Sequence, residues 1–337
     1  MQSLQKIEIS AKTIVFTILF ILLLQFLVVI KDLIFALFIA FIIASALRPF
    51  VVWLTKRQIP RLISLIIVYL LFVGVMGSTI ALIVPPLIKE SFLLAKTLPS
   101  IVEKLVPKNS SFFDINSVVQ YVPNLTNQLI NIIQSTFSNV VFLMSIIFFS
   151  FYFLIEENTI KKSLVRFFDE NQSQRIGSIF DNAEKKLNSW FWGELVLMTI
   201  VGVCTFVGLS LIGLKYVVPL ALLAGLLEVV PNLGPTIAAI PAILIGFSQN
   251  YFLGLAALAV SVIVQQLENN VIVPLVMKKA VGISPAITLI ALIVGGKLAG
   301  VMGVLLAIPT MLFLEVIISE IIKKPSINKT QITKDSI

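Results

Sequence analysis

Long apolar runs without a charged side chain recur along the whole chain. Residues 13–30, 62–88 and 195–214 contain no Asp, Glu, Lys or Arg. Each run is close to or above the roughly 20 residues that a helix needs to cross a hydrocarbon core of about 30 Å. Only 12% of the residues are charged, against about 25% in soluble domains. We therefore predict an all-α polytopic integral membrane protein.

Shorter runs and polar stretches define the expected organisation of the chain. About eight transmembrane segments are expected, with re-entrant or broken helices in the C-terminal half. The last break is expected at Gly295-Gly296-Lys297, between apolar pieces at 280–296 and 299–322. The predicted regions are N-terminal transmembrane helices (1–88), an extramembrane amphipathic segment (89–138), a transmembrane helix (139–156), a cytoplasmic amphipathic segment (157–193), a C-terminal core of broken helices (194–322) and a cytoplasmic tail (323–337).

Basic residues lie in short clusters between the apolar runs. This distribution follows the positive-inside rule and predicts a multi-pass protein of the cytoplasmic membrane with both termini in the cytoplasm. It also makes nucleic acid an unlikely partner in spite of a net charge of +8. The lipid bilayer is the expected partner instead.

The rare residue types exclude several kinds of chemistry. The chain has no histidine and one cysteine, Cys204, so disulfide frameworks, catalytic triads and common zinc sites are not expected. No phosphate-binding loop of the Walker type is present. We predict no resident cofactor or metal and no enzymatic activity.

Residues before the third long run predict an amphipathic helix with one apolar stripe. Ile176, Phe180, Ala183, Leu187 and Trp190 recur at intervals of four and three residues. The apolar run at 195–214 follows directly. We interpret the stripe as an interfacial or packing surface without chemistry.

A break rich in Pro and Gly interrupts the C-terminal half at residues 231–235. The sequence Pro231-Asn232-Leu233-Gly234-Pro235 separates apolar pieces at 216–230 and 236–247. Fifteen residues of helix cover only about 22 Å. Such irregular backbone at membrane depth must be buried in protein or line a wet cavity, and it is a pointer to a binding site.

A polar turn lies inside the apolar run at 251–277. It consists of Gln265, Gln266, Glu268, Asn269 and Asn270 around Leu267. On an ideal helix, the first, third and fourth of these side chains share one face and the other two extend it. We expect this face to meet a cavity, a subunit interface or the broken helices.

Isolated charges in this half need compensation. A carboxylate at the centre of a bilayer costs at least about 2.5–3.5 kcal/mol unless it has a partner, water or a proton. Glu228 and Glu268 are therefore candidate proton or cation carriers, and Lys215 and Lys297 are candidate charge partners. Glu194 and Glu315 lie nearer the ends of their runs, where water can reach them.

The same residues resemble signatures of the AI-2E (autoinducer-2 exporter) family. The matching motifs are Glu228-Val229-Val230-Pro231-Asn232-Leu233-Gly234-Pro235 with Ile240-Pro241, Gln265-Gln266-Leu267-Glu268-Asn269-Asn270 with Val273-Pro274, Val281-Gly282, Gly295-Gly296, Gly300, Gly303, Ala307-Ile308-Pro309, Leu47-Arg48-Pro49 and Ile59-Pro60-Arg61. The resemblance covers nearly the whole chain, and its C-terminal motifs are specific.

The resemblance implies a secondary transporter that forms a homo-oligomer, with a pentamer as the expected form. It implies either export of a small polar solute such as autoinducer-2, or Na⁺(Li⁺)/H⁺ antiport with H⁺ or Na⁺ as the coupling ion. Another class of function stays open, an oligomeric membrane scaffold without transport. For the transporter, the expected pathway residues are Glu268, Asn269, Asn270, Gln265, Gln266, Glu228, Pro231, Asn232, Gly234 and Pro235.

Overall fold

The described part of the chain consists of helices without strands. The computed structural model describes residues 11–79, 81, 85, 140–156, 169–231, 233–277 and 284–322. Its helices are α1 (Ala11–Val29), α2 (Lys31–Lys56), a helix at Arg61–Thr79, α5 (Val140–Ile155), α7 (Glu170–Leu211), α8 (Val217–Leu227), α9 (Leu233–Gln249), α10 (Tyr251–Leu267), the π-helix η1 (Glu268–Ile272), α11 (Val273–Met277), α12 (Pro285–Leu305) and α13 (Ala307–Ile322). In this part, six helices are long and apolar enough to cross a membrane. The predicted all-α membrane fold is confirmed.

Several predicted segments lie outside the described residues. These are nearly all of the extramembrane segment at 89–138, the first part of the segment at 157–193, the linker that holds Val281-Gly282, and the tail at 323–337.

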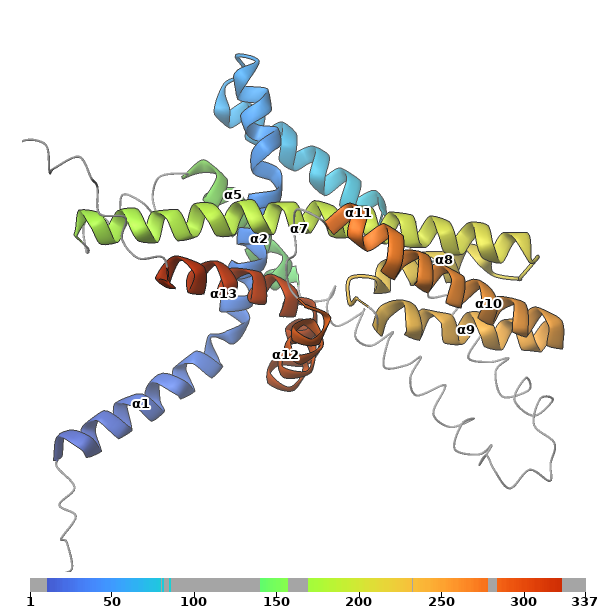
Figure 1. Cartoon of the computed structure of the whole chain (residues 1–337). Helices are drawn as coiled ribbons and strands as arrows, with labels where there is room; N and C mark the ends of the chain where they lie inside the picture. The colour runs from blue at the N-terminus through green and yellow to red at the C-terminus, as the bar shows by residue number, and fades with distance from the viewer. Residues whose placement is uncertain are drawn as a thin grey trace, which may run out of the picture.

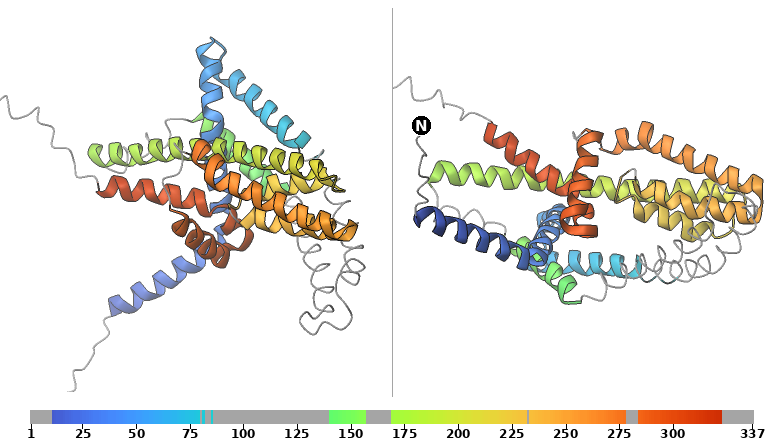
Figure 2. Two further views of the ribbon diagram at one scale, coloured as in Figure 1. Left: turned by 45° about the vertical axis from the view of Figure 1, so that its right-hand side comes forward. Right: turned by 90° about the horizontal axis from the view of Figure 1, so that it is seen from below.

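The 42-residue helix α7 is in contact with helices from both halves of the chain. At 1.5 Å per residue it is about 63 Å long, roughly twice the thickness of a hydrocarbon core. Figures 1 and 2 show α2 crossing α7 near its middle, α13 lying along the first half of α7, and α8, α9 and α10 packing beside the second half. Because α2 runs across α7 in Figure 1, the two helices cannot both be perpendicular to the plane of one bilayer.

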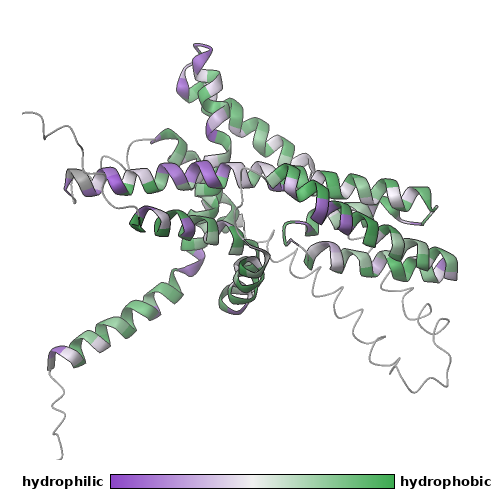
Figure 3. Cartoon of the chain, viewed as in Figure 1, coloured by the Kyte–Doolittle hydropathy of each residue, from purple (hydrophilic) through white to green (hydrophobic). Residues whose placement is uncertain are grey.

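The two halves of α7 differ in polarity as well as in the helices that pack against them. Figure 3 shows that the first half is largely hydrophilic, whereas the second half and most other helices are apolar. By contrast, α1 has an apolar surface that is 0% buried, which is the expected state of a helix surrounded by lipid. The exposed apolar side chains of the other helices have the same explanation.

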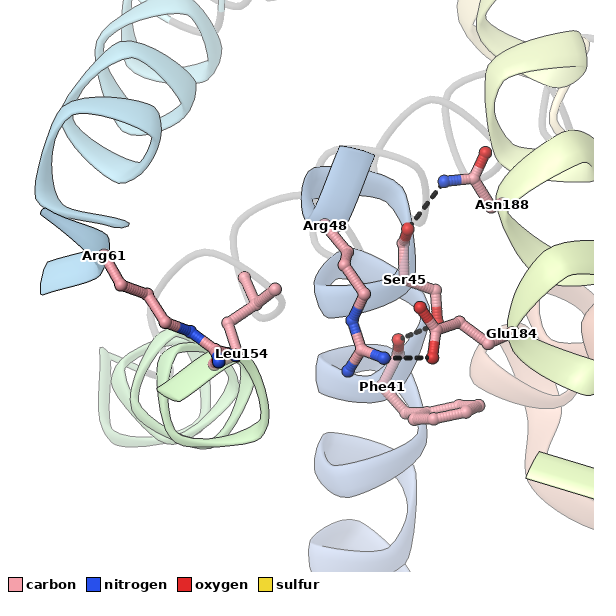
Figure 4. Close-up of polar contacts among 7 residues, drawn as sticks. All are labelled: Phe41, Ser45, Arg48, Arg61, Leu154, Glu184 and Asn188. Carbon is pink, nitrogen blue, oxygen red and sulfur yellow. Dashed lines mark hydrogen bonds and ion pairs between the residues drawn. The ribbon is translucent and has the colours of Figure 1, made fainter. Parts of the chain in front are cut away.

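The crossing of α2 and α7 is built around Pro49, which lies inside α2. Proline has no amide N–H, so the carbonyl group of Ser45, four residues earlier, loses its helical donor. Asn188 of α7 supplies a replacement, because its Nδ2 donates to the Ser45 carbonyl oxygen at 2.6 Å (Figure 4). One turn later on α7, the indole N–H of Trp192 donates to the carbonyl oxygen of Ala46 at 3.1 Å.

Apolar side chains surround this polar crossing. Buried Ile42 of α2, Leu187 of α7 and Leu312 of α13 belong to one cluster. Phe41 of α2 makes edge-to-face contacts with Phe153, Phe180 and Phe313, which come from α5, α7 and α13. Each such aromatic pair contributes about 0.5–1.5 kcal/mol beyond its buried area. Four helices are thereby fixed to one another at the crossing.

Helix α12 is sharply kinked and folds back on itself. Ala299 and Gly300 leave the helical region, and Gly300 has φ 59° and ψ −136°, which glycine adopts far more readily than other residues. Gly295 and Gly303 then meet so closely that a Cβ atom on either would collide with the carbonyl oxygen of the other. The sequence placed the break earlier, at Gly295-Gly296-Lys297; the structure shows that the first of these glycines is a packing residue.

A double-mutant cycle tests the crossing. We expect Asn188→Leu to destabilise the protein by about 1–3 kcal/mol, because the buried Ser45 carbonyl group loses its donor. In that background, Pro49→Ala restores a backbone N–H and should recover more than half of the loss. Thermal unfolding of the detergent-solubilised variants measures both effects. Equal effects of Pro49→Ala with and without Asn188 would contradict this explanation.

Candidate functional site

The predicted break between short helices is present. Helix α8 ends at Leu227 and α9 begins at Leu233, and the turn between them is held by hydrogen bonds from Val230 N to the Leu227 oxygen and from Gly234 N to the Val230 oxygen, at 3.0 and 2.8 Å. Pro235 lies in the first turn of α9, where its missing N–H leaves no helical acceptor unpaired. Pro231 lies within the turn, and Asn232 lies outside the described residues.

Gly234 allows the two short helices to approach each other. A Cβ atom at this position would collide with the backbone carbonyl group of Leu227, the last residue of α8. The first turn of α9 therefore packs directly against the last turn of α8. Glu228 follows Leu227 and occupies the C-terminal cap of α8.

Three glutamates from three different elements gather beside this turn, and we name them the carboxyl cluster. Glu228 comes from the end of α8, Glu268 from the start of η1, and Glu194 from α7. Their exposed fractions are 1%, 1% and 4%. Glu228 interacts electrostatically with both of the others, and its carboxyl group lies within hydrogen-bonding range of that of Glu268.

Among the described residues, the carboxyl cluster has no hydrogen-bond donor. Both carboxyl oxygens of Glu194, both of Glu228 and Oε2 of Glu268 are buried without a hydrogen-bond partner in this part of the chain. Two ionised carboxylates can only accept, so Glu228 and Glu268 form a hydrogen bond with each other only when one of them carries a proton. The indole N–H of Trp190, one turn before Glu194, is also buried without an acceptor.

The predicted lysine partners are not at the cluster. Lys215 and Lys297 are exposed, and neither forms an ion pair with any residue in the described ranges. Glu315 lies apart from the cluster, half-exposed, and pairs with Lys186 of α7 at 2.6 Å. An ionised and unpaired carboxylate is costly at such depth, so a cluster without a cationic partner among the described residues favours protons or bound cations as its balancing charge.

The polar turn leads into a π-helix, and its side chains do not share one buried face. The N–H of Val273 bonds to the carbonyl oxygen of Glu268, five residues earlier, so η1 is wider than an α-helix. Glu268 is buried and Gln265 half-buried, whereas Gln266, Asn269 and Asn270 are exposed. The side chain of Asn270 donates to the backbone and side-chain oxygens of Gln266 at 3.0 and 2.8 Å. An ideal helix had predicted one common face for Glu268 and Asn269.

A narrow cavity lies among α7, α8, α9 and α10, and we name it the core cavity. Its volume is about 20 Å³, and its polar lining consists of Thr205, Ser261 and Gln265. A cavity needs about 10–15 Å³ to hold one water molecule. Ser261 donates its hydroxyl proton to the Ala257 carbonyl oxygen at 2.9 Å, which leaves the lone pairs of the hydroxyl oxygen available as acceptors.

The core cavity and the carboxyl cluster adjoin along two helices. Ala224 lines the cavity and precedes Glu228 by one turn on α8. Gln265 also lines the cavity and precedes Glu268 by one turn on α10. Among the described residues, no group of three or more His, Cys, Asp or Glu has the geometry of a metal site. A cation here would therefore combine one or two carboxylates with hydroxyl and amide oxygens.

Glu194 is a member of the cluster that the sequence did not identify. It was interpreted as a helix-end residue in reach of water. The signal was nevertheless present, because Glu194 continues the stripe of Leu187 and Trp190 at the next interval of four. Both of these residues are buried, and so is Glu194. A carboxylate on the apolar stripe of an amphipathic helix indicates a buried charge.

Comparison with known proteins shows the family of the chain. The family model described as "AI-2E family transporter" matches residues 14–323. YueF of Bacillus subtilis (strain 168) is 27% identical over 84% of this chain and 83% of its own length. YrrI of the same strain is 26% identical over 86% of this chain and 87% of its own, and YhhT of Escherichia coli (strain K12) is 26% identical over 82% of each. Each is named a "putative transport protein".

Substitution of Gly234 tests the close approach at the break. We expect Gly234→Ala to destabilise the protein by about 1–3 kcal/mol, because the added methyl group forces α8 and α9 apart. Gly74→Ala is the matched control, since a Cβ at Gly74 has nothing within 4 Å and alanine favours a helix by about 1 kcal/mol. Thermal unfolding in detergent compares the two. Equal melting temperatures would refute the close approach.

Proposed function

Because the chain belongs to the AI-2E transporter family, we propose that it exchanges a small monovalent cation, Na⁺ or Li⁺, for protons across the cytoplasmic membrane. The observation that carries this proposal is the carboxyl cluster. Three buried glutamates, with no basic partner in the described part of the chain, meet beside a break between two membrane helices. Such a site requires positive charge, and protons and cations are the species that supply it.

Competition for the same negative charge would couple the two ions. In the proton-loaded state, a protonated Glu228 or Glu268 donates a hydrogen bond to its neighbour. In the cation-loaded state, the ion takes the place of the proton between these oxygens. Because the empty, fully ionised cluster is costly, one species leaves as the other enters. Exchange follows from electrostatics without a nucleotide-binding domain.

The core cavity supports a small ion as the transported species. Its volume of about 20 Å³ suits one water molecule or one dehydrated alkali cation and is far too small for a furanose. Ser261 and Gln265 of α10 offer a hydroxyl and an amide oxygen one to two helical turns before Glu268, and Thr205 of α7 adds a second hydroxyl. Hard cations prefer such oxygen ligands.

A second candidate is export of a small polar solute such as autoinducer-2. The observation in its favour is a set of three exposed side-chain amides, which can form hydrogen bonds with a polyol. They belong to Gln266, Asn269 and Asn270. These amides face away from the carboxyl cluster, either toward a neighbouring subunit or toward a solute path outside this chain. The third alternative, an oligomeric membrane scaffold without transport, gains no support from the carboxyl cluster, because a structural site would be expected to pair its buried carboxyl groups with hydrogen-bond donors.

Transport measurements test the proposed exchange. In liposomes that enclose a pH-sensitive dye, an imposed Na⁺ or Li⁺ gradient should drive proton movement. We expect Glu228→Gln and Glu268→Gln each to reduce the rate about tenfold or more, the effect of losing one charged interaction of about 1.5–3 kcal/mol. Glu315→Gln is the matched control and should change the rate less than about twofold.

The same assay can reject the proposal. If no alkali cation drives proton movement in the unmodified protein, antiport is excluded. Release of a labelled polyol signal in that case would establish the second candidate.

The role of the core cavity has a separate test. We expect Ser261→Ala to raise the KM for Na⁺ about fivefold, since a neutral ligand contributes about 1 kcal/mol, with little change in maximal rate. Ser145→Ala is the control, because Ser145 makes the same hydroxyl-to-carbonyl bond on an exposed face of α5. An unchanged KM in Ser261→Ala would remove the cavity from the cation pathway.

A further inference from the structure

The three members of the carboxyl cluster differ in how far they lie from the core cavity along their helices. Glu228 and Glu268 each follow a cavity-lining residue by about one helical turn, roughly 4.5 to 6 Å along the axis. On α7, the first cavity-lining residue after Glu194 is Val201, about two turns or roughly 10 Å farther along. Glu194 is therefore the carboxyl group farthest from the cavity along its own helix.

Apolar packing encloses Glu194 on α7. Side chains three, four and seven residues away along a helix share a face with it, and those on the stripe of Glu194 are buried. They are Leu187, Trp190, Leu197 and Val201. Beside them, a Cβ atom on Gly193 would lie 2.9 Å from the sulfur of Met277, so α11 packs closely against this part of α7. The surroundings of Glu194 offer little to stabilise a charge.

Glu194 also lies in the field of two other carboxyl groups. It interacts electrostatically with Glu268 and with Glu228, and both of its oxygens are buried without a partner among the described residues. The indole of Trp190, one turn earlier on the stripe, carries no charge. Desolvation and repulsion between like charges thus both oppose a negative charge on Glu194.

The pair formed by Glu228 and Glu268 is in a different position. These two carboxyl groups lie within hydrogen-bonding range of each other, so one proton or one cation between them can neutralise part of their charge. They are also the members nearer to the oxygen ligands of the core cavity. The cluster therefore contains one pair suited to exchanging ions and one carboxyl group that is better left neutral.

We propose that Glu194 keeps its proton throughout the transport cycle, so that one Na⁺ or Li⁺ crosses the membrane for each proton. This inference rests on the proposed antiport. The cation binds to Glu228 and Glu268 as their shared proton leaves, and the pair has the same net charge in both loaded states. A second proton lost from Glu194 would add one buried negative charge, which no cationic side chain near the cluster in the described ranges neutralises.

The response to membrane potential tests this coupling on the unmodified protein. Liposomes containing the protein are loaded with K⁺ and valinomycin, and the distribution of labelled Na⁺ is measured at a fixed pH difference. One-for-one exchange moves no net charge, so a potential of about 59 mV should change the final Na⁺ ratio less than about twofold. Exchange of two protons per cation moves one net charge, and the same potential would then shift the ratio about tenfold.

The outcomes separate this inference from the proposed function. A Na⁺ ratio that follows the potential would overturn the one-for-one coupling and leave antiport intact. Absence of any exchange between alkali cations and protons would overturn both.

Infrared difference spectroscopy tests the proton on Glu194 without a transport assay. Addition of Na⁺ to the purified full chain at constant pH should remove one carbonyl stretching band of a protonated carboxyl group. We expect Glu268→Gln to lose this Na⁺-dependent band and Glu194→Gln to keep it, because the band belongs to the exchanging pair. Glu315→Gln is the matched control and should also keep it. Loss of the band in Glu194→Gln, with Glu315→Gln unaffected, would show that Glu194 releases its proton and would overturn the proposal.

Discussion

The rest of the structure depends on how α2 is fastened across α7. Pro49 removes a helical hydrogen bond from α2, and a carbonyl group left without a donor at a buried crossing would cost about 1–3 kcal/mol. Asn188 restores that bond from α7 at 2.6 Å, and the ion pair of Arg48 with Glu184 adds a second link one turn away. The carbonyl group that Pro49 leaves without a donor in α2 thus finds its donor in α7. This makes the crossing specific in register, which apolar packing alone does not provide.

Helix α7 connects this crossing to the carboxyl cluster. Asn188 and Glu194 are separated by less than two turns on one rigid helix. A change in the charge state of the cluster that shifts Glu194 relative to α8 and η1 must therefore also move α7 against α2. The crossing, with its short polar bonds and aromatic contacts, is the place where such a movement would be resisted or transmitted. The proposed ion exchange would be linked mechanically to the arrangement of the long helices for this reason.

The apolar membrane helices and the break at residues 231–235 could be predicted from the sequence, because both depend on residues that are close together in the chain. Apolar runs predict membrane helices, and Pro231 with Gly234 predicts the interruption beside Glu228. The position of Asn269 was harder to predict, because it directly follows buried Glu268 and only tertiary packing decides which side of the π-helix is covered. The kink of α12 was displaced for a similar reason. Glycine permits either a turn or close packing, and only the tertiary contact distinguishes Gly295 from Gly300.

The exposed positions of Lys215 and Lys297 have a mechanistic consequence that residue spacing did not reveal. Had Lys215 or Lys297 paired with Glu228 or Glu268, the site would hold a fixed internal cation and would gain little from an external one. With both lysines exposed, neutralisation of the buried carboxyl groups falls to ions that can enter and leave. The cost of an unbalanced carboxylate at membrane depth then opposes the empty state and favours a cycle between two loaded states. An exchanger requires that property, whereas a structural ion pair would destroy it.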